Sequence, residues 1–481
     1  MKLLLVSPAP FPPSRAAKAL QQMRRMGIHG GDSPPLGLAS IAAPAEAAGH
    51  EVRLLDMRTE NTTREEMEAE LRAFAPDAIG WYLATFNIRE CVEAARFARS
   101  VRPGAQQIVG GPNVGIYPRE TMLHDCFDYG FQGECDEVFA PFLDGIAAGR
   151  PDLATPGLVH RRPGGEIAVS PEVPFPADLD RLPMPSHHLF RARYRYFGAC
   201  REPYTSMIAS RGCPFNCRFC GRVPGSRRVR YRSAAKLLEE MRHVRKLGFR
   251  EVNFFDDLFT LNRRRVIDLC RALIDEGLDL VWSVRARVDS VDEEMLSLMK
   301  TAGCRRLYFG VESGSDRTLE LMNKKIASAQ AREALRLTRK LGLETVSYFI
   351  IGYPGESEAD MRRTVEFASR LETDFTSFNM FEPLPATYEL EKWIERGGIP
   401  DPWHEYLALK TDRIPQYHGD LDRAVVERHF RDAWRSFYLR PRTWWNLVRR
   451  VNSPARLKNF AWAGLSMAVG LLTPSRMEGK S

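Results

Sequence analysis

The sequence predicts an α/β protein with two parallel-sheet units that are joined by a linker and followed by a helical C-terminal region. The chain has 481 residues, more than one hydrophobic core normally supports. Short apolar runs alternate with helical stretches over residues 1–145 and again over 201–392, which is typical of parallel sheets covered by helices. Residues 146–200 are rich in proline, which disfavours long helices and interior strands, and residues 393–481 form the helical region.

The first unit, residues 1–145, begins with a buried strand, because the apolar start before Pro8 is too short for a signal peptide. The alternation that follows predicts a Rossmann-like sheet with helices on both faces. Strands are expected at Lys2–Ser7, Glu51–Asp56, Ala78–Trp81, Gln107–Gly110 and Tyr129–Gln132. Helices are expected at Gly37–Ala48, Arg64–Phe74 and Ile88–Ser100.

Polar and glycine-containing segments follow these strands. Ligands of open α/β sheets bind outside the carboxyl ends of the strands, so the loops there form the expected binding site. Glycines in such loops let a ligand or another backbone come close. The residues at this edge are Ser7, Thr85, Gly110-Gly111-Pro112-Asn113 and Gly133-Glu134.

The second unit, residues 201–392, is predicted to form a partial (β/α)6 barrel, with its functional groups at the carboxyl ends of the strands as in the eight-fold barrel. Strands are expected at Thr205–Ala209, Glu251–Phe255, Asp279–Val284, Arg306–Phe309, Thr345–Ile351 and Ser377–Phe381. Helices are expected between them, at Ala234–Leu247, Arg263–Glu276, Glu293–Ala302, Ala329–Leu341 and Glu358–Leu371.

Three cysteines in C-x3-C-x2-C spacing, Cys213, Cys217 and Cys220, follow the first of these strands. The spacing suits one tight loop around three corners of a cubane iron–sulfur cluster, and thiolates are the ligands that such clusters take. Three protein ligands leave one iron of the cubane open to a non-protein ligand. The alternative is a zinc loop, but zinc sites usually combine two pairs of Cys or His ligands, and the chain has no second pair.

This loop resembles the signature of the radical S-adenosylmethionine (SAM) superfamily, in which the open iron chelates the amino and carboxylate groups of SAM. The resemblance implies a [4Fe–4S] cluster on the three cysteines, with the Phe219 ring beside it. It also implies SAM contacts at the next strand ends. Asp256 or Asp257 could accept the SAM ammonium, the alternative being that this pair caps a helix. Arg285 or Arg287 could meet a carboxylate.

Three later segments keep the order and spacing of the same superfamily. Residues 308–315 resemble its ribose motif, in which Glu312 is placed for hydrogen bonds to hydroxyls. Residues 349–356 resemble the strand that supports the adenine through backbone groups. Residues 381–387 match the sixth strand end, except that a usual glycine is Ala386. The SAM-binding residues implied by the first two segments are Glu312, Ser313, Gly352 and Pro354.

The first unit resembles the cobalamin-binding domain that precedes the radical core in one large subfamily. The resemblance rests on residues 33–38, 47–52 and 109–113 together with residues 133–134. The glycines would let the nucleotide tail of the corrinoid slide along the sheet edge, the alternative being that they only turn the sheet. The cobalamin contacts that this implies are Ser7, Thr85, Gly110, Gly111, Pro112, Asn113, Gly133 and Glu134.

The first unit departs from the best-known cobalamin domains in one respect. The D-x-H-x-x-G signature, whose histidine coordinates cobalt from below, is absent, since no histidine follows Asp56 at that spacing. Many members of the resembling subfamily lack it too, so cobalamin is still implied. His29, His50 and His124 are expected on the surface or in the core, and the lower axial ligand of cobalt stays open.

The bulk properties favour a globular protein of a reducing compartment. Six of the nine cysteines are scattered without pairing, so a disulfide framework is not expected; a low-oxygen cytoplasm fits. The net charge of +8 is modest and spread along the chain, so no nucleic-acid partner is expected. The apolar stretch 460–472 is too short to span a bilayer, and is either a peripheral membrane anchor or a helix packed on the barrel or on a dimer partner.

The combined resemblance implies a cobalamin-dependent radical SAM enzyme that cleaves SAM reductively at the cluster to a 5′-deoxyadenosyl radical. The favoured reaction is methylation of an unactivated carbon of a small-molecule or lipid substrate, because methylation is the more frequent outcome in that subfamily. The alternatives are oxidative cyclisation or ring rearrangement without methyl transfer, and a non-enzymatic cobalamin- or SAM-binding regulator. A methylthiotransferase is disfavoured, since Cys91 is the first cysteine of the chain. The enzyme would need an external electron donor such as a flavodoxin or ferredoxin.

Overall fold

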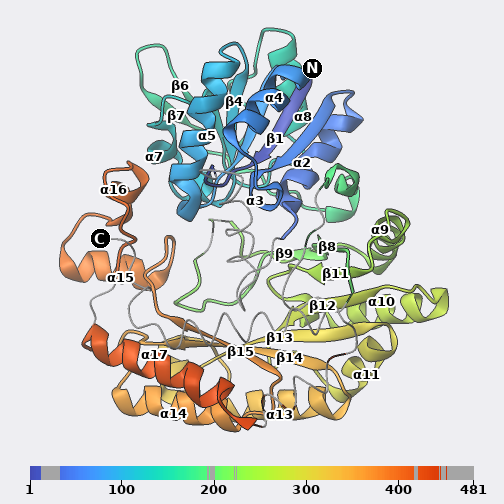
Figure 1. Cartoon of the computed structure of the whole chain (residues 1–481), viewed down its shortest axis with the longest axis vertical. Helices are drawn as coiled ribbons and strands as arrows, with labels where there is room; N and C mark the ends of the chain where they lie inside the picture. The colour runs from blue at the N-terminus through green and yellow to red at the C-terminus, as the bar shows by residue number, and fades with distance from the viewer. Residues whose placement is uncertain are drawn as a thin grey trace.

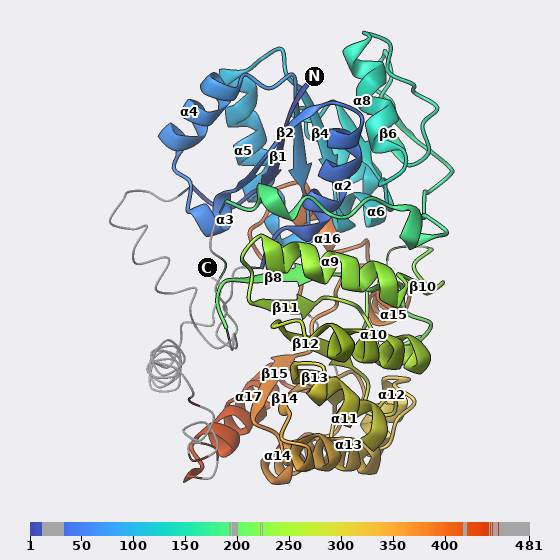
Figure 2. The same cartoon turned by 90° about the vertical axis from the view of Figure 1, so that its right-hand side faces the viewer.

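The computed structural model describes residues 1–11, 33–191, 194, 201–221, 223, 225–416, 421–441, 443, 445 and 451. Two α/β units stand one above the other in Figure 1, with the N-terminal unit at the top and the barrel unit below it. The turned view in Figure 2 shows the same two layers. The apolar stretch 460–472 and His29 lie outside the described residues.

The N-terminal unit is built on a seven-stranded sheet in the order β2-β1-β3-β4-β5-β6-β7, whose first five strands are parallel. Each strand and helix predicted within residues 1–145 is present, with ends within one residue. The strands are β1 (Lys2–Ser7), β2 (Glu51–Asp56), β3 (Ala78–Tyr82), β4 (Gln106–Gly110), β5 (Tyr129–Phe131), β6 (Leu158–Arg161) and β7 (Ile167–Val169). The helices are α2 (Leu36–Ala47), α3 (Met57–Glu60), α4 (Arg64–Phe74), η1 (Thr85–Asn87), α5 (Ile88–Val101), α6 (Pro112–Ile116), α7 (Pro118–Met122) and α8 (Phe139–Ala147).

Strands β6 and β7 differ from the prediction that residues 146–200 are a linker without interior strands. They form an antiparallel hairpin, and β6 also pairs with β5, so both belong to the N-terminal sheet. The prolines lie outside the paired residues, and the turn uses Gly164 and Gly165 with φ of +100° and +93°. Proline density therefore marks the ends of this hairpin and did not exclude it. The described residues in the remainder of the predicted linker form the short helices η2 (Leu179–Arg181) and η3 (His187–Leu189).

The barrel unit is a six-stranded, fully parallel sheet in the order β15-β14-β13-β12-β11-β8, and the two end strands do not pair with each other. It is therefore the predicted partial barrel. The strands are β8 (Tyr204–Met207), β11 (Glu251–Phe254), β12 (Val281–Ala286), β13 (Cys304–Glu312), β14 (Glu344–Ile351) and β15 (Phe375–Met380). The helices are α9 (Ala234–Lys246), η4 (Phe259–Leu261), α10 (Arg263–Glu276), α11 (Glu293–Thr301), α12 (Asp316–Leu321), α13 (Ser328–Lys340) and α14 (Glu358–Arg370).

The segment after the barrel returns to the N-terminal unit before it ends on the barrel. Helix α15 (Tyr388–Gly397) lies between the two units, and α16 (Trp403–Leu407) lies beside α7, as Figure 1 shows. Trp403 is fully buried, and the carbonyl of Leu407 lies 2.8 Å from the His124 imidazole. Helix α17 (Arg423–Tyr438) then packs on α14 and β15. The C-terminal region thus ties both units together.

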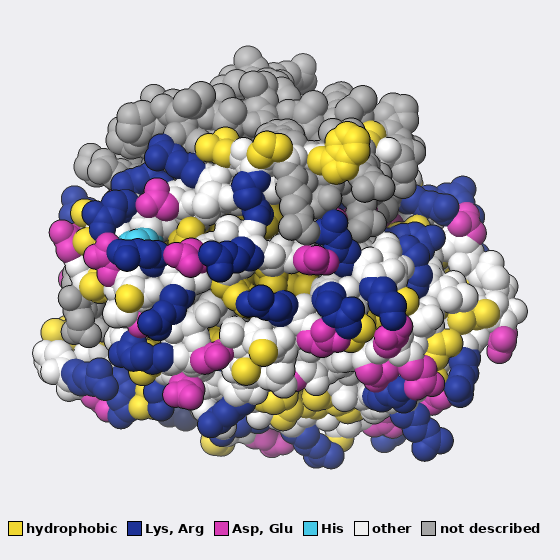
Figure 3. Space-filling model, turned by 90° about the horizontal axis from the view of Figure 1, so that it is seen from below, with side chains coloured by type: hydrophobic (Ala, Val, Ile, Leu, Met, Phe, Trp, Pro, Cys, Tyr) yellow, Lys and Arg dark blue, Asp and Glu magenta, His cyan; other side chains and the backbone are white. Residues whose placement is uncertain are grey.

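The end of the barrel formed by α13, α14 and α17 carries a mixed surface. Seen from below, basic and acidic side chains are interspersed over this face without a field of one sign (Figure 3). Within the described ranges, no helix combines the length and the apolar character that crossing a membrane requires.

Candidate active site

The cysteine loop leaves the barrel through a short antiparallel hairpin, β9 (Ser210–Arg211) and β10 (Arg230–Tyr231). Gly212 starts the loop with φ of +94°, and a Cβ there would lie 2.5 Å from a backbone oxygen, so only glycine fits. Cys213 N–H donates to the Ser226 carbonyl at 3.1 Å, and Cys220 N–H donates to the Cys217 carbonyl at 3.2 Å. The backbone therefore holds the three thiols on one closed loop.

Cationic side chains line the inner wall of this loop. The Arg287 guanidinium lies 3.8 Å from the centre of the Phe215 ring, and the Lys324 ammonium lies 5.6 Å from that of Phe219. Burial raises the pKa of the Cys217 thiol, while the charges of Lys324 and Arg287 act in the opposite direction. Cations beside a cysteine favour the thiolate, which is the form that binds iron.

Asp256 and Asp257 follow β11 in different environments. Asp256 is buried, and its carboxylate accepts hydrogen bonds from Ala209 N–H at 2.7 Å and from the Ser210 hydroxyl. Burial raises the pKa of Asp256 to about 6, against the opposing charge of Arg265. Both Asp256 oxygens thus hold the strand end that leads into the cysteine loop, which leaves Asp257 as the more accessible partner for an ammonium. Asp257 is exposed and keeps that predicted role.

The two arginines at the end of β12, Arg285 within the strand and Arg287 just after it, have different partners. Arg287 is committed to the protein, since it forms an ion pair with Asp289 at 2.9 Å and donates to the Lys324 carbonyl at 2.9 Å. Arg285 donates from Nη1 to the Phe254 carbonyl at 2.9 Å and stacks on the Phe255 ring. Its Nη2 makes no hydrogen bond to the described part of the chain. Of the two predicted carboxylate partners, Arg285 is the available one.

Glu312 occupies a strained position at the end of β13. Its φ is +67°, which is rare for a residue with a side chain and typical of functional sites, and the β13–β14 register shifts just before it. Its Oε1 accepts a hydrogen bond from the Lys324 ammonium at 2.8 Å, and both side chains are about nine-tenths buried. Lys324 thus orients Glu312 and also lies beside Phe219 of the cysteine loop.

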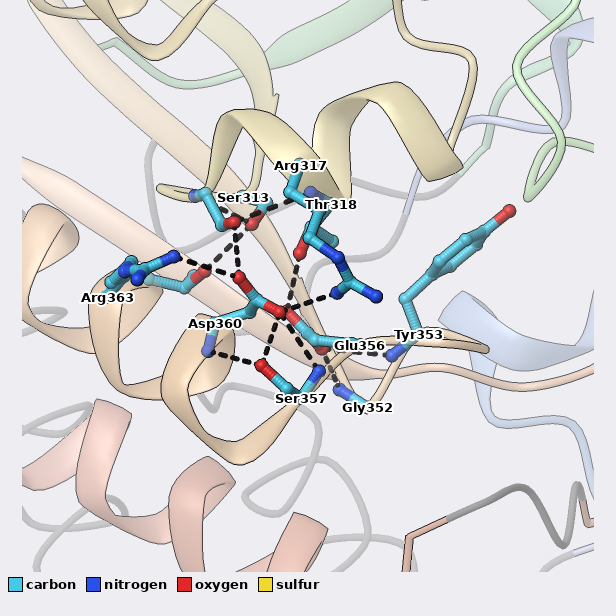
Figure 4. A network of polar contacts seen from close by, with 11 residues as sticks. Ser313, Arg317, Thr318, Gly352, Tyr353, Glu356, Ser357, Asp360 and Arg363 are labelled. Atoms are coloured by element: carbon cyan, nitrogen blue, oxygen red, sulfur yellow. Dashed lines mark hydrogen bonds and ion pairs between the residues drawn. The ribbon is translucent and has the colours of Figure 1, made fainter.

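Figure 4 shows a polar network that includes Ser313 and Gly352, two residues that were expected to contact SAM. The Ser313 hydroxyl bonds to Thr364 Oγ1 at 2.8 Å and is fully buried. The Gly352 N–H donates to Glu356 at 2.8 Å, as does the next backbone N–H at 3.1 Å. Gly352 is required by packing, because a Cβ there would lie 2.4 Å from Val426 of α17. Ser313 and Gly352 therefore form these hydrogen bonds within the protein. Half-buried Pro354 lies in the same turn as Gly352.

Three polar side chains inside the barrel were not predicted from the sequence to belong to the site. Ser206, Asn253 and Ser283 lie opposite one another on β8, β11 and β12, and each is at most 5% exposed. Their neighbours Phe254 and Trp282 pack on each other and on η4, so these three side chains face the barrel interior. Among the described residues, Ser206 Oγ, Asn253 Oδ1 and Ser283 Oγ have no hydrogen-bond partner. These three residues are neighbours because of the register of the strands, which could not be predicted from the sequence.

The carboxyl edge of the N-terminal sheet faces the cysteine loop. Strand order reverses between β1 and β3, which is the switch point where open α/β sheets bind ligands. Ser7 ends β1 and buried Thr85 follows β3, so both flank this point. A Cβ on Gly110 would meet no atom within 4 Å, whereas one on Gly115 of α6 would lie 2.9 Å from Val223, just beyond the third cysteine.

The other predicted cobalamin residues split into two groups. Gly111 makes the sharp turn into α6, where Pro112 is the first residue and Asn113 is fully buried with Oδ1 lacking a partner among the described residues. Gly133 and Glu134 have another role. A Cβ on Gly133 would clash with the backbone at residue 174, and the Glu134 carboxylate binds arginines of the β9–β10 hairpin. These two residues pack against protein, which corrects their predicted contact with cobalamin.

The described histidines of the N-terminal unit lie where the sequence analysis expected them. His50 precedes β2 at the amino edge of the sheet and contacts Asp144 at 3.2 Å. His124 is buried against α16. Burial lowers the pKa of both imidazoles. Neither histidine is at the carboxyl edge where a corrinoid would bind.

Comparisons with known proteins agree with this arrangement. Residues 207–368 match the radical SAM superfamily and residues 27–143 match the B12 binding domain. An uncharacterized methyltransferase of Pyrococcus horikoshii is 31% identical over 448 residues, covering 92% of this chain and 93% of that protein. The chain belongs to the radical SAM superfamily and carries a B12-binding domain.

Two further likenesses are with a cyclase and with a methyltransferase of known structure. The anaerobic magnesium-protoporphyrin IX monomethyl ester cyclase of Rubrivivax gelatinosus is 26% identical over 369 residues, covering 74% of this chain and 65% of the cyclase. The solved structure of the radical SAM methyltransferase TsrM from Kitasatospora setae, with cobalamin and a [4Fe–4S] cluster bound, has a TM-score of 0.69 at 18% identity. That match covers 94% of this chain and 89% of TsrM, and shows that the two share a fold.

A radical SAM domain implies a [4Fe–4S] cluster and SAM, and a B12-binding domain implies cobalamin. The residues present fit these groups. The loop offers three thiols beside two cations, and the N-terminal unit offers Gly110 at the carboxyl end of β4, where a Cβ would meet no atom within 4 Å. In the described chain no three His, Cys, Asp or Glu side chains converge on one ion. A cubane does not require this, because each thiolate binds a different iron.

Proposed function

We propose that this chain is a cobalamin-dependent radical SAM methyltransferase that acts on an unactivated carbon of a small molecule. The observation that carries the proposal is the meeting of the cysteine loop with the glycine edge of the B12-binding domain, where Gly115 abuts Val223. A cluster bound by the cysteine loop and a cobalamin bound at the glycine edge would share one space above the barrel. The cluster supplies an electron for SAM cleavage and cobalamin carries a methyl group when both are bound.

The chain's own side chains bind and orient SAM in this proposal. The strained Glu312, held by Lys324, accepts hydrogen bonds from the ribose hydroxyls. Asp257 receives the ammonium and Arg285 a carboxylate. The three polar side chains inside the barrel, Ser206, Asn253 and Ser283, favour a polar substrate over a lipid, since buried polar atoms require partners.

The comparisons support methyl transfer over the alternatives. The Pyrococcus horikoshii relative is named a methyltransferase, and the TsrM structure shares the fold of both units. Ring formation without methyl transfer is the second candidate, since the match with the cyclase of Rubrivivax gelatinosus covers 74% of this chain. We expect the electron to come from a flavodoxin or ferredoxin.

The products per turnover distinguish the two reactions. A methyltransferase of this kind consumes two SAM molecules and yields S-adenosylhomocysteine and 5′-deoxyadenosine in equal amounts. Anaerobic incubation with SAM labelled in its methyl group, a reductant and a metabolite extract should place the label on one substrate. Formation of 5′-deoxyadenosine without S-adenosylhomocysteine and without a labelled product would contradict the methyltransferase and favour the cyclase.

A further inference from the structure

An ion-pair cluster connects the B12-binding domain with the hairpin that carries the cysteine loop. We call its four residues, Glu134, Asp136, Arg211 and Arg230, the domain clamp. Arg211 contacts Asp136 with both terminal nitrogens at 2.8 and 2.9 Å, and Glu134 with one of them at 2.8 Å. Arg230 contacts the two oxygens of Glu134 at 2.6 and 2.9 Å. The two acids come from the loop after β5, and the two arginines from the hairpin.

The clamp lies at the base of the cysteine loop. Arg211 in β9 comes two residues before Cys213, and Arg230 in β10 lies directly opposite Arg211 in the antiparallel register. Two like charges in directly opposed positions repel, and destabilise such a pair of strands. Glu134 and Asp136 of the other domain neutralise both charges. The closed form of the hairpin is therefore stabilised by docking of the B12-binding domain.

The clamp is buried, which distinguishes it from the surface ion pairs of the chain. The side chains of Arg230 and Asp136 are 4% and 6% exposed, and those of Arg211 and Glu134 are 17% and 20% exposed. Burial opposes the charge of Asp136, but its bonds to Arg211 outweigh this, and its pKa lies below the usual range. Bidentate arginine–carboxylate pairs fix geometry more strictly than they raise stability when they are buried.

Neighbouring contacts make the same junction rigid. Arg230 also donates to the Pro176 carbonyl at 2.9 Å, and the Glu134 N–H donates to the Pro174 carbonyl at 2.9 Å. A Cβ on Gly225 of the cysteine loop would clash with the Phe175 ring at 2.3 Å. The segment 174–176 is thus held between the acidic loop and the cysteine loop.

We propose that the domain clamp is a positioning device that sets the distance between the cluster bound by the cysteine loop and the cobalamin bound by the other domain. The proposal rests on the function proposed above and adds residues that touch neither cofactor. Its consequence is that loss of the clamp uncouples the two halves of the reaction. SAM cleavage at the cluster then continues, but fewer cleavage events lead to methyl transfer.

The test uses cofactor-loaded wild-type chain and the variants Asp136→Asn, Arg211→Gln and the double variant of both. The control is Glu294→Gln, which removes an exposed carboxylate that Arg263 binds within the barrel alone. Iron and cobalamin contents are measured first. The EPR splitting of cob(II)alamin by the reduced cluster then reports their separation, and labelled product per 5′-deoxyadenosine reports coupling.

Both single variants should keep wild-type iron and cobalamin contents, lose or broaden the EPR splitting, and lower the coupling by about ten- to a hundred-fold, since a displacement of about 1 Å can cost that much. The double variant should be no worse than either single variant, because the two residues act as one pair. Glu294→Gln should match the wild type in every measurement.

Three results would overturn the proposal. One is an unchanged splitting and coupling in both single variants. Another is loss of iron or cobalamin from both of them, because the clamp would then hold the loops together without setting their spacing. The third is additive loss of coupling in the double variant. If the wild type itself makes no methylated product, the proposed function fails, and the EPR splitting alone still decides whether the clamp sets the distance.

Discussion

Glu312 and its neighbour Ser313 show what a motif can and cannot say about single residues. The ribose-like motif drew attention to both, and the structure separates them. Glu312 has a positive φ and its Oε1 accepts a hydrogen bond from Lys324, whereas the Ser313 hydroxyl is used by Thr364. Asp256 and Asp257 separate in the same way, through burial of one carboxylate. Adjacent residues differ here because backbone turns give them different neighbours, which sequence spacing does not encode.

Replacing Glu312 is expected to weaken SAM binding. Loss of a buried, charge-assisted hydrogen bond costs about 1.5–3 kcal/mol, so Glu312→Ala should lower SAM affinity by roughly ten- to a hundred-fold. Equilibrium binding to the cluster-loaded chain measures this. Ser313→Ala is the matched control and should change affinity by less than about twofold, because its hydroxyl bonds only to protein. A larger loss of SAM affinity in Ser313→Ala than in Glu312→Ala would contradict this assignment of the two residues.

Glu356 is expected to make stability depend on pH. Burial raises the pKa of this carboxyl from 4.5 to about 7, although backbone N–H groups of Tyr353 and Gly352 oppose the shift. The folded chain therefore holds a proton that the unfolded chain has lost between these two values. The resulting stabilisation is complete below about pH 4.5 and is lost as the pH rises through 7.

Glu356→Gln imitates the protonated form and should remove that dependence. Its amide oxygen can still accept the two backbone hydrogen bonds of the turn. Denaturant unfolding at a series of pH values should show the wild type losing on the order of 3 kcal/mol relative to the variant between pH 5 and 8. Parallel pH profiles of the two proteins would show that Glu356 is ionised in the folded state throughout.

At the scale of elements, the parallel strands were predictable from the sequence, but the β6–β7 hairpin and the return of α15 and α16 to the N-terminal unit were not. Buried parallel strands read as apolar runs, and the helices between them carry clear amphipathic patterns and caps, such as the Thr63–Glu66 capping box of α4. The β6–β7 hairpin was missed because its strands are short and bordered by prolines. The return of α15 and α16 to the N-terminal unit was missed because it depends on contacts between residues almost 300 positions apart.

Trp403 is expected to hold this returning segment in place. The side chain is fully buried, its ring centre lies 5.6 Å from that of Phe86, and its indole N–H donates to the Pro383 carbonyl at 2.9 Å. Trp403→Ala should lower the free energy of unfolding by about 3–5 kcal/mol, as measured by denaturant titration. Ile399→Ala, at a 37% exposed position of the same segment, should cost less than about 1 kcal/mol. Equal losses would show that the segment is not anchored through Trp403.

At the scale of the whole molecule, the order of the parts was predictable and their junction was not. The cysteine spacing and the motifs after it were sufficient to predict the barrel and its cofactors, since each depends on residues close in sequence. The junction depends on Arg211 and Arg230 meeting Glu134 and Asp136, which are about 75–96 positions away. Glu134 was therefore assigned to cobalamin, although its acidic side chain pairs with the hairpin. Charge complementarity between distant loops leaves no local pattern in a single sequence.

The central claim is that one chain binds a cluster through the cysteine loop and a corrinoid through a separate domain. Anaerobic reconstitution of the wild type and of a variant with Cys213, Cys217 and Cys220 all replaced by alanine tests it most directly. The wild type should bind about four irons and one cobalamin per chain and form 5′-deoxyadenosine from SAM. The variant should keep the cobalamin and lose both the irons and the 5′-deoxyadenosine. A variant that retains the full cluster spectrum, or a wild type that binds no corrinoid, would contradict the claim.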